Sequence, residues 1–245
     1  MRTIGIIGGM SAESTALYYS RLNAEARRRL GGLHSAQTLI WSVDFAEIAE
    51  MQAQGAWAAA GRKLADVAQR LERGGAEVLI LATNTMHKVA DQIESAVAIP
   101  LLHIADATAQ KVVAAGCKRP GLMATHYTME QDFYKGRMAE RFGLDVLVPD
   151  EAGRADTHRI IYDELCKGVV SPDSRVRYQA IARELIAAGA DSLILGCTEV
   201  GMLLNQGNVT VPVFDTTLIH ADAALDWVLS DAVATPKQRA TGTHG

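Results

Sequence analysis

An eleven-residue pattern that occurs twice limits the folds open to this chain. Residues 75–85 read GAEVLILATNT and residues 189–199 read GADSLILGCTE, so both share Gly-Ala, an acidic residue and a Leu-Ile-Leu run, 114 positions apart (189 − 75). The openings of the two halves also correspond, because residues 3–14 align with residues 119–130 at an offset of 116 (119 − 3) that places Gly5 on Gly121. Two matches in the same order predict a duplicated unit of strands and helices.

Short apolar runs alternate with segments of helical periodicity, which is typical of an α/β fold with parallel strands and helices on both faces of each sheet. The expected strands span residues 3–9, 37–43, 77–82, 100–104, 119–125, 144–149, 192–196 and 211–215. The expected helices span residues 14–30, 57–73 and 175–188, and another ends near residue 116. A glycine at or just after the end of each of these helices is the expected C-terminal signal.

The repeat divides the chain into two lobes. We predict that residues 1–99 and 208–231 form the first α/β lobe and that residues 100–207 form the second. A chain of 245 residues is long enough to bury a core in each lobe. Residues 232–245, which contain Thr, Gly and Pro, are predicted to be a flexible tail.

Charge and composition exclude several classes of partner. The formal net charge of -4 offers no electrostatic attraction to nucleic acid or to an anionic membrane. The chain has neither the apolar segment of a secretion signal nor a run of the roughly 18 apolar residues that a membrane span needs, so a cytoplasmic location is expected. Its three cysteines lack the spacing of metal ligands, so we expect no metal site and no disulfide framework.

The ends of the predicted strands indicate where a ligand binds. Ligands of open α/β sheets bind beyond the carboxyl ends of the strands. If the two lobes face each other, these ends converge on one cleft, and the repeat then places Thr83 and Cys197 on opposite sides of a bound molecule. The other residues that follow strands directly are Gly8 to Ser11, Asn84, Thr85, Thr125, Thr198 and Glu199.

Two opposed proton-transfer groups are what a racemase or epimerase requires. One group removes a proton from a carbon atom, and the other returns a proton to the opposite face. Cysteine suits this role because its reference pKa of about 8.5 is lowered by backbone amides and helix N-termini. The alternative for Cys197 is a small buried apolar residue, which is the interpretation that we give to Cys117 and Cys166.

Five motifs resemble those of the aspartate/glutamate racemase family, the amino-acid racemases that work without pyridoxal phosphate. They are GIIGGMS, TNTMH, ATHYTMEQDFY, GCTE and PVFDTT, in this order, and the resemblance extends to about residue 229. It implies two pseudo-symmetric flavodoxin-like lobes, an active site between them, a two-base mechanism that needs no cofactor, an aspartate or glutamate substrate and a homodimer.

The first motif contains threonine where most members of that family have cysteine. The resemblance is strongest to the members that prefer L-aspartate and L-glutamate, which share this threonine. An alcohol is a far weaker acid than a thiol, so Thr83 is not a ready anionic base and needs help from solvent or from His87. We expect Cys197 to deprotonate the L-enantiomer and Thr83 to deliver the proton on the other side.

Residues around this pair are candidates for substrate binding. Asn84, Thr85, Thr125 and Thr198 are expected to hold the α-carboxylate together with backbone amides, or else to be ordinary turn residues. Met10 and Ser11 are expected at the floor of the cleft. Gln52 is placed to reach a carboxylate or amide of the substrate, and Glu199 to orient Cys197 or bind the amine.

Recognition of an acidic side chain lacks its expected partners. The resemblance implies an arginine after the second strand and a lysine in the second lobe, but residues 42–52 contain no arginine and Cys166 stands at the lysine position. A broader amino-acid specificity therefore stays open. The alternatives to a racemase are a decarboxylase or cis–trans isomerase that uses Cys197, a cysteine hydrolase, and a non-catalytic binder of small molecules.

Overall fold

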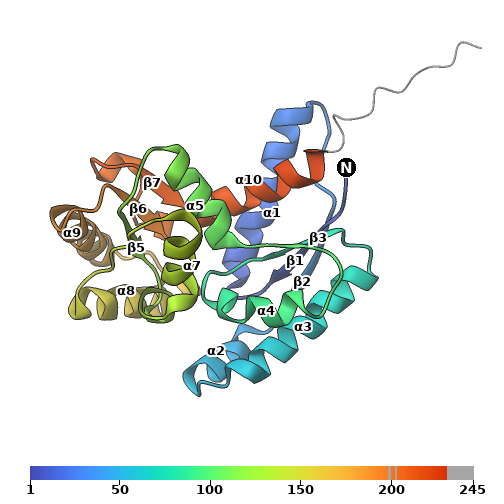
Figure 1. Ribbon diagram of the computed structural model, residues 1–245, viewed down its shortest axis with the longest axis horizontal. Helices are drawn as coiled ribbons and strands as arrows, with labels where there is room; N and C mark the ends of the chain where they lie inside the picture. Colours follow the sequence, from blue (N-terminus) through green and yellow to red (C-terminus); the bar gives the residue numbers. More distant parts are fainter. Residues whose placement is uncertain (198–199, 202, 231–245) are drawn as a thin grey trace, which may run out of the picture.

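Two parallel sheets form the framework of the chain. The computed structural model describes residues 1–197, 200–201 and 203–230 (Figure 1). The first sheet has the strand order β2-β1-β3-β4, and every adjacent pair is parallel. Its strands are β1 (Ile4–Gly8), β2 (Thr38–Ser42), β3 (Val78–Leu81) and β4 (Leu101–Leu102).

The second sheet repeats this order. Its strands β5 (Pro120–Met123), β6 (Ser192–Leu195) and β7 (Val213–Asp215) are also parallel, in the order β5-β6-β7. A parallel bridge between Gly121 and Leu147 adds chain on the outer side of β5. Residues 144–149 were expected to form a strand, but the structure has only this single bridge there.

Helices cover both faces of the first sheet. Side chains of β1 and β3 alternate between two apolar clusters, so Ile7 and Leu79 pack on one side and Ile4 and Ile80 on the other. Because both faces are covered, all the residues of β1 and β3 are buried. The helices of this part are α1 (Ala12–Leu30), α2 (Phe45–Ala53), α3 (Trp57–Arg73), the 3₁₀ helix η1 (Thr85–Val89) and α4 (Ala90–Glu94).

The second sheet is covered in the same way, with one apolar cluster on each face. Its helices are α5 (Ile104–Ala114), α6 (His126–Glu130), α7 (Asp132–Phe142), α8 (Glu151–Asp163), the 3₁₀ helix η2 (Leu165–Lys167) and α9 (Pro172–Ala187). The apolar pattern of the sequence did not single out α6, α7 and α8, and two of them are shorter than twelve residues. They supply part of the wall between the lobes.

The chain crosses between the lobes at other positions than the sequence indicated. β4 pairs with β3 although residues 100–207 were assigned to the second lobe, and β7 pairs with β6 although residues 208–231 were assigned to the first. The crossings therefore lie after β4 and after β7. An apolar run of two or three residues fits the edge of either sheet, so the sequence does not indicate its partner. The predicted tail, 232–245, lies outside the described residues.

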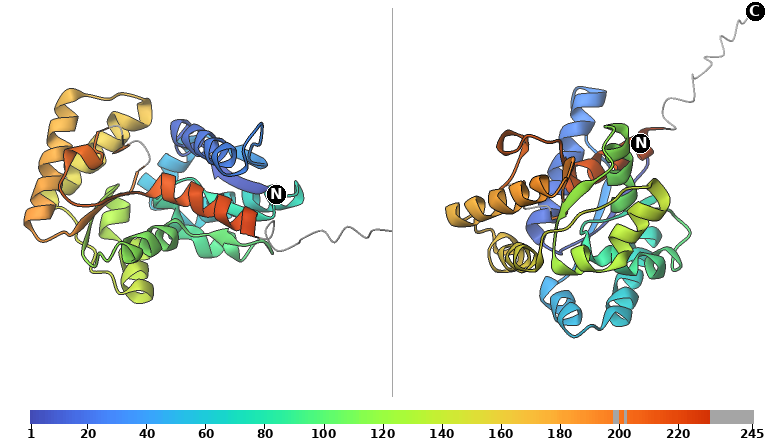
Figure 2. Two further views of the ribbon diagram at one scale, coloured as in Figure 1. Left: turned by 90° about the horizontal axis from the view of Figure 1, so that it is seen from above. Right: turned by 60° about the vertical axis from the view of Figure 1, so that its left-hand side comes forward.

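The last helix ties the two lobes together. α10 (Thr216–Leu229) begins directly after β7 and runs along α1 (Figure 2). Its Ala221 and Leu225 join Tyr18 and Leu22 of α1 in one apolar cluster, and it also contacts α5. None of the helices in the described ranges is both long and apolar enough to cross a membrane.

A glycine in the first strand of each sheet packs closely against the neighbouring strand, at equivalent positions in the two lobes. A Cβ atom on Gly5 would lie 2.7 Å from Leu79 Cδ2 and 2.8 Å from Ala76 Cβ. A Cβ atom on Gly121 would meet the equivalent residues, Leu193 at 3.0 Å and Ala190 at 3.3 Å. The duplication inferred from sequence is therefore also a duplication of packing, and the tighter contact is in the first lobe.

Replacing these glycines tests that packing. Gly5→Ala should lower the free energy of unfolding by about 1–3 kcal/mol, because a methyl group does not fit between Leu79 and Ala76. Gly121→Ala should lower the free energy of unfolding by a smaller amount, because its contacts at 3.0–3.3 Å are longer. Gly136→Ala is the matched control: that glycine lies inside α7 with no contact closer than 3.4 Å, so alanine should stabilise by about 0.5–1 kcal/mol. Urea unfolding at pH 7 measures all three, and an unchanged Gly5→Ala would contradict the close approach.

Candidate active site

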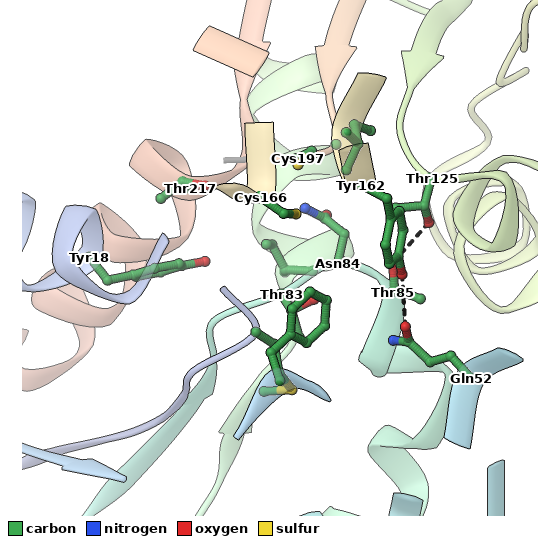
Figure 3. A pocket seen from close by; sticks show the side chains of 15 residues that line it. Tyr18, Gln52, Thr83, Asn84, Thr85, Thr125, Tyr162, Cys166, Cys197 and Thr217 are labelled. Atoms are coloured by element: carbon green, nitrogen blue, oxygen red, sulfur yellow. Dashed lines mark hydrogen bonds between the residues drawn. The ribbon is translucent and has the colours of Figure 1, made fainter. Parts of the chain in front are cut away.

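A cavity lies between the lobes at the carboxyl ends of the strands (Figure 3). Thr83, Asn84 and Thr85 reach it from the end of β3, and Gly196 and Cys197 reach it from the end of β6. The other lining residues are Met10, Tyr18, Phe45, Gln52, Ile104, Thr125, Ile161, Tyr162, Cys166 and Thr217. Residues from both halves of the repeat therefore face one space.

Thr83 and Cys197 enter the cavity from opposite lobes (Figure 3). Both side chains are half-buried, so both are accessible to a small molecule. In the described part of the chain, no residue hydrogen-bonds the Thr83 hydroxyl. Cys166, from η2, lies on the same side of the cavity as Cys197 and is half-buried, although we interpreted it from the sequence as a small buried apolar residue.

His87 holds the turn that carries Thr83. Its Nδ1 lies 2.7 Å from the Thr83 carbonyl oxygen, and its Nε2 accepts from the backbone N–H of Ile104 at 3.2 Å. Because a carbonyl oxygen only accepts, the proton of this ring is on Nδ1. Both ring nitrogens are thus occupied by backbone groups. His87 positions the chain at Thr83 and does not relay a proton to its hydroxyl.

Three threonine hydroxyls join the lobes beside the cavity. Thr85 Oγ1 lies 2.9 Å from Thr125 Oγ1, and Thr128 Oγ1 lies 3.3 Å and 3.2 Å from these two atoms. Thr85 follows β3 and Thr125 follows β5, so this contact fixes the separation of the two strand ends. All three side chains are buried.

The side-chain amide of Asn84 has a defined orientation. Its Nδ2 donates to Thr216 Oγ1 at 3.0 Å, and the Thr216 hydroxyl donates to the Leu195 carbonyl oxygen at 2.9 Å. Because the only proton of that hydroxyl is used, Thr216 must accept from Asn84, which places the amide nitrogen on this side. The Asn84 carbonyl oxygen Oδ1 has no hydrogen-bond partner among the described residues.

Gln52 contacts the opposite lobe. The Tyr162 hydroxyl donates to Gln52 Oε1 at 2.7 Å (Figure 3). Gln52 Nε2 donates to the sulfur of Met86 at 3.0 Å. The ring of Phe45 stacks on Tyr162 with centroids 6.1 Å apart. Burial raises the pKa of Tyr162 well above its usual range, so this hydroxyl stays protonated. Together these side chains close one end of the cavity with neutral polar groups.

The remaining predicted site residues are placed as follows. Met10 and Thr125 line the cavity. Ser11 is not among the lining residues; it is buried, and its hydroxyl accepts from the Ser14 N–H at 3.1 Å to cap α1. Thr198 and Glu199 lie outside the described residues. Within the described part of the chain, no three His, Cys, Asp or Glu side chains come together as ligands of a metal ion would.

The sequence did not indicate the lining residues that come from helices. These are Tyr18, Phe45, Ile104, Ile161, Tyr162, Cys166 and Thr217. Thr217 had a usable signal, because Thr216 and Thr217 follow the last apolar run just as Thr83 follows the third. Ile104 ends the expected strand 100–104, and Cys166 stands where the resemblance implies a lysine, but neither was assigned to the site. The others lie inside helices, where nothing in the sequence shows which side faces a cleft.

Three buried histidines pack together behind the cavity wall. The ring of His87 lies 4.5 Å from His103 and 5.9 Å from His220 between centroids. Burial lowers the pKa of His103 to about 3 and that of His220 to about 4, and it also holds the pKa of His87 well below its usual value. All three are therefore neutral at pH 7.

Known proteins are similar to this chain over nearly its whole length. Residues 7–224 match the sequence profile of the family described as Asp/Glu/Hydantoin racemase. A crystal structure from Yersinia pestis, provisionally named an Asp/Glu racemase, is 50% identical with a TM-score of 0.87, over 94% of this chain and 100% of the other. The structure of an aspartate racemase homologue from Pyrococcus horikoshii OT3 is 34% identical with a TM-score of 0.80, over the same shares.

A relative compared by sequence alone covers nearly the same range. The broad specificity amino-acid racemase RacX of Bacillus subtilis is 22% identical over 240 residues, which are 93% of this chain and 98% of RacX. These similarities extend over both lobes and both walls of the cavity.

The neutral histidines predict a fall in stability below pH 6.5. The unfolded chain binds protons at an ordinary histidine pKa near 6.5, whereas the folded chain does so only at much lower pH, so unfolding takes up protons. The stabilisation is complete above pH 6.5 and is lost as the pH falls toward the folded pKa values of about 3 and 4. Each histidine contributes a slope of up to about 1.4 kcal/mol per pH unit.

Urea unfolding between pH 7.5 and 5 measures this slope. His103→Asn should make it shallower, because it removes one titrating ring and keeps an acceptor for the Ala105 N–H that His103 now caps. His34→Asn, at an exposed position, is the control and should leave the slope unchanged. Equal stability at pH 7.5 and pH 5 would contradict the assignment of neutral buried rings.

Proposed function

The chain belongs to the Asp/Glu/hydantoin racemase family of isomerases, and from this membership we propose that it racemises an amino acid by moving the Cα proton between Cys197 and Thr83 without a cofactor. One observation carries the proposal: these two side chains line a single cavity from opposite lobes. The two faces of one carbon atom then meet two different proton-transfer groups.

The proposed reaction has two steps. The Cys197 thiolate takes the Cα proton of the L-enantiomer, which leaves a carbanion whose charge spreads into the carboxylate. Thr83 then gives its hydroxyl proton to the opposite face of Cα. Afterwards the Thr83 oxygen takes a proton from solvent and the Cys197 thiol loses one, so the enzyme returns to its starting state.

The two directions of this reaction are not equivalent. A thiol with a reference pKa of about 8.5 provides a thiolate near neutral pH far more readily than an alcohol provides an alkoxide. Starting from the D-enantiomer would require Thr83 to act as the base. His87 does not compensate, because both of its ring nitrogens bind backbone groups. We therefore propose that the enzyme prefers the L-enantiomer.

A cofactor is not needed for this chemistry because Cys197 and Thr83 are themselves placed to exchange the proton. The described lining of the cavity also contains no lysine that would hold pyridoxal phosphate as a Schiff base. Hydrogen-bond donors for the carboxylate are available nearby, since the Thr85 and Thr125 hydroxyls line the cavity together with the backbone of the Thr83 turn.

Family membership favours aspartate or glutamate as the substrate, in line with the names of several relatives. The cavity itself favours a second candidate, an amino acid with a short uncharged polar side chain. None of the described residues that line the cavity carries a charge, and the end formed by Gln52, Tyr162 and Cys166 is neutral and polar. The similarity to a racemase named for broad specificity supports this second candidate.

Exchange of the Cα proton for deuterium tests the catalytic pair. In deuterium oxide, L-aspartate, L-glutamate, L-serine and L-asparagine are followed by NMR for loss of the Cα proton signal. Cys197→Ser should lower the exchange rate at least about 100-fold, the usual loss on removal of a general base. Cys117→Ser is the matched control, because that cysteine is buried in the core of the second lobe and should leave exchange unchanged.

The pattern of exchange separates the alternatives. Undiminished exchange in Cys197→Ser would remove this thiol from the mechanism. Binding of amino acids without any exchange in the unmodified protein would favour a non-catalytic binder. Exchange restricted to L-aspartate and L-glutamate would exclude the uncharged substrate.

Thr83→Cys tests the asymmetry between the enantiomers. It supplies a second thiol, so the initial rate from the D-enantiomer should rise about tenfold or more relative to the rate from the L-enantiomer. Thr83→Ser keeps an alcohol and should keep the preference. Initial rates are followed by chiral chromatography. Equal initial rates from both enantiomers in the unmodified protein would contradict the proposed preference for the L-enantiomer.

A further inference from the structure

One end of the cavity contains buried oxygen atoms that lack partners. Asn84 Oδ1 and Thr217 Oγ1 have no hydrogen-bond partner among the described residues, and their side chains line the cavity. Asn84 is only 5% exposed and Thr217 only 2%. Buried polar atoms in native proteins are nearly always paired, so these two oxygens mark a place for a polar ligand group.

The free atom of Asn84 is an acceptor. Thr216 fixes the amide nitrogen on the other side, since its own proton goes to the Leu195 carbonyl. The carbonyl oxygen Oδ1 is left without a partner, and one of the two N–H groups of the amide is not used by Thr216. A carboxylate, which also only accepts, does not pair with Oδ1. Oδ1 therefore suits a donor group of the substrate, and only the second N–H of the amide could serve the α-carboxylate.

Tyr18 is an acceptor for a similar reason. His220 Nε2 lies 2.8 Å from the Leu102 carbonyl oxygen and must donate to it. Its ring is neutral at pH 7, so its other nitrogen, Nδ1, has no proton and accepts from the Tyr18 hydroxyl at 2.8 Å. The one proton of Tyr18 is thereby used, and its oxygen keeps only lone pairs. Figure 3 shows this hydroxyl pointing into the pocket, toward Asn84.

The charges around this end favour a cation. The carboxylate of Asp215 caps α10 by accepting from the N–H groups of Thr217 and Leu218. Its negative charge also acts at Tyr18, where it adds to the effect of burial in raising the pKa of the phenol. No lysine or arginine is among the described lining residues. Asp215 itself does not line the cavity, and the Arg21 guanidinium near it is paired with Asp222, so the Asp215 carboxylate offsets the positive end of the helix behind Thr217.

We propose that Tyr18 Oη, Asn84 Oδ1 and Thr217 Oγ1 form the subsite for the α-ammonium group of the substrate. Three acceptors match the three N–H donors of an ammonium group, and together they hold the amine in its protonated form. A protonated amine withdraws electrons from Cα and makes its proton more acidic, which helps Cys197 to remove it. This subsite rests on the proposed function, since it assumes that the cavity binds an amino acid.

Binding of matched ligand pairs tests the subsite. Titration calorimetry on the full chain with Cys197→Ser, which prevents turnover, gives Kd for L-aspartate and for succinate, the same skeleton without the amine. L-Serine and 3-hydroxypropionate form a second pair for an uncharged side chain. Tyr18→Phe and Thr217→Val should each weaken binding of the amino acid about tenfold or more, because each removes an acceptor from a charged group. Binding of the des-amino acid should change less than twofold.

Two comparisons guard against a merely structural effect. Thr217→Val is independent of the contact with His220 that Tyr18→Phe also removes. Tyr134→Phe removes an equally buried hydroxyl from the core of the second lobe, outside the cavity, and should leave both ligands of a pair unchanged. Equal weakening of the amino acid and its des-amino analogue by Tyr18→Phe and Thr217→Val would overturn the subsite, as would no effect on either ligand.

The result also separates the subsite from the racemase function. If the unmodified protein exchanges Cα protons but the amino acid and its des-amino analogue bind equally tightly, the racemase stands and the subsite falls. If no amino acid of the panel binds or exchanges, both fall.

Discussion

Hydrogen bonds that cross between the carboxyl ends of two parallel sheets hold the cavity in shape. Thr85 meets Thr125 on one side, and Asn84 reaches Thr216 and, through it, the end of β6. Both connections start from the turn that follows β3. Because β3, β5 and β6 are buried along their whole length and cannot shift in register, a contact between their ends also fixes the lobes. The position of Thr83 relative to Cys197 depends on these contacts.

The walls of the cavity are polar but uncharged in the described residues, and this has consequences for the chemistry. Buried histidines stay neutral, and their tautomers are set by the backbone carbonyls of Thr83 and Leu102. Fixed dipoles of this kind need no rearrangement when charge develops on a substrate, which is the usual source of catalytic stabilisation. The carboxylate of Asp215 lies behind the wall, where it also caps α10. The chain thus offers acceptors at one end of the cavity and hydroxyl and amide donors at another.

Much of this organisation could be predicted from the sequence. The repeat placed Thr83 opposite Cys197, and the structure has both on one cavity, with Gly5 and Gly121 in equivalent contacts. The helix expected at residues 57–73 is α3, with the same bounds. The sequence failed where patterns are short: β4 and β7 have two and three residues, and each was assigned to the wrong sheet. It carried no signal for Tyr162 of α8, and Cys166 of η2 was noted only because it stands where the resemblance implies a lysine.

The sequence by itself determined the α/β class, the duplicated lobe and the identity of the two residues proposed to exchange the proton. These follow from periodicity and from repeated order, which are properties of the chain read in one dimension. Only the tertiary structure decided what each polar atom is able to do. Whether Asn84 offers a donor or an acceptor, and whether Tyr18 gives or receives a hydrogen bond, depends on partners 132 and 202 residues away. A hydrogen-bond role is set by the groups that already use an atom's proton, and the fold alone brings those groups together.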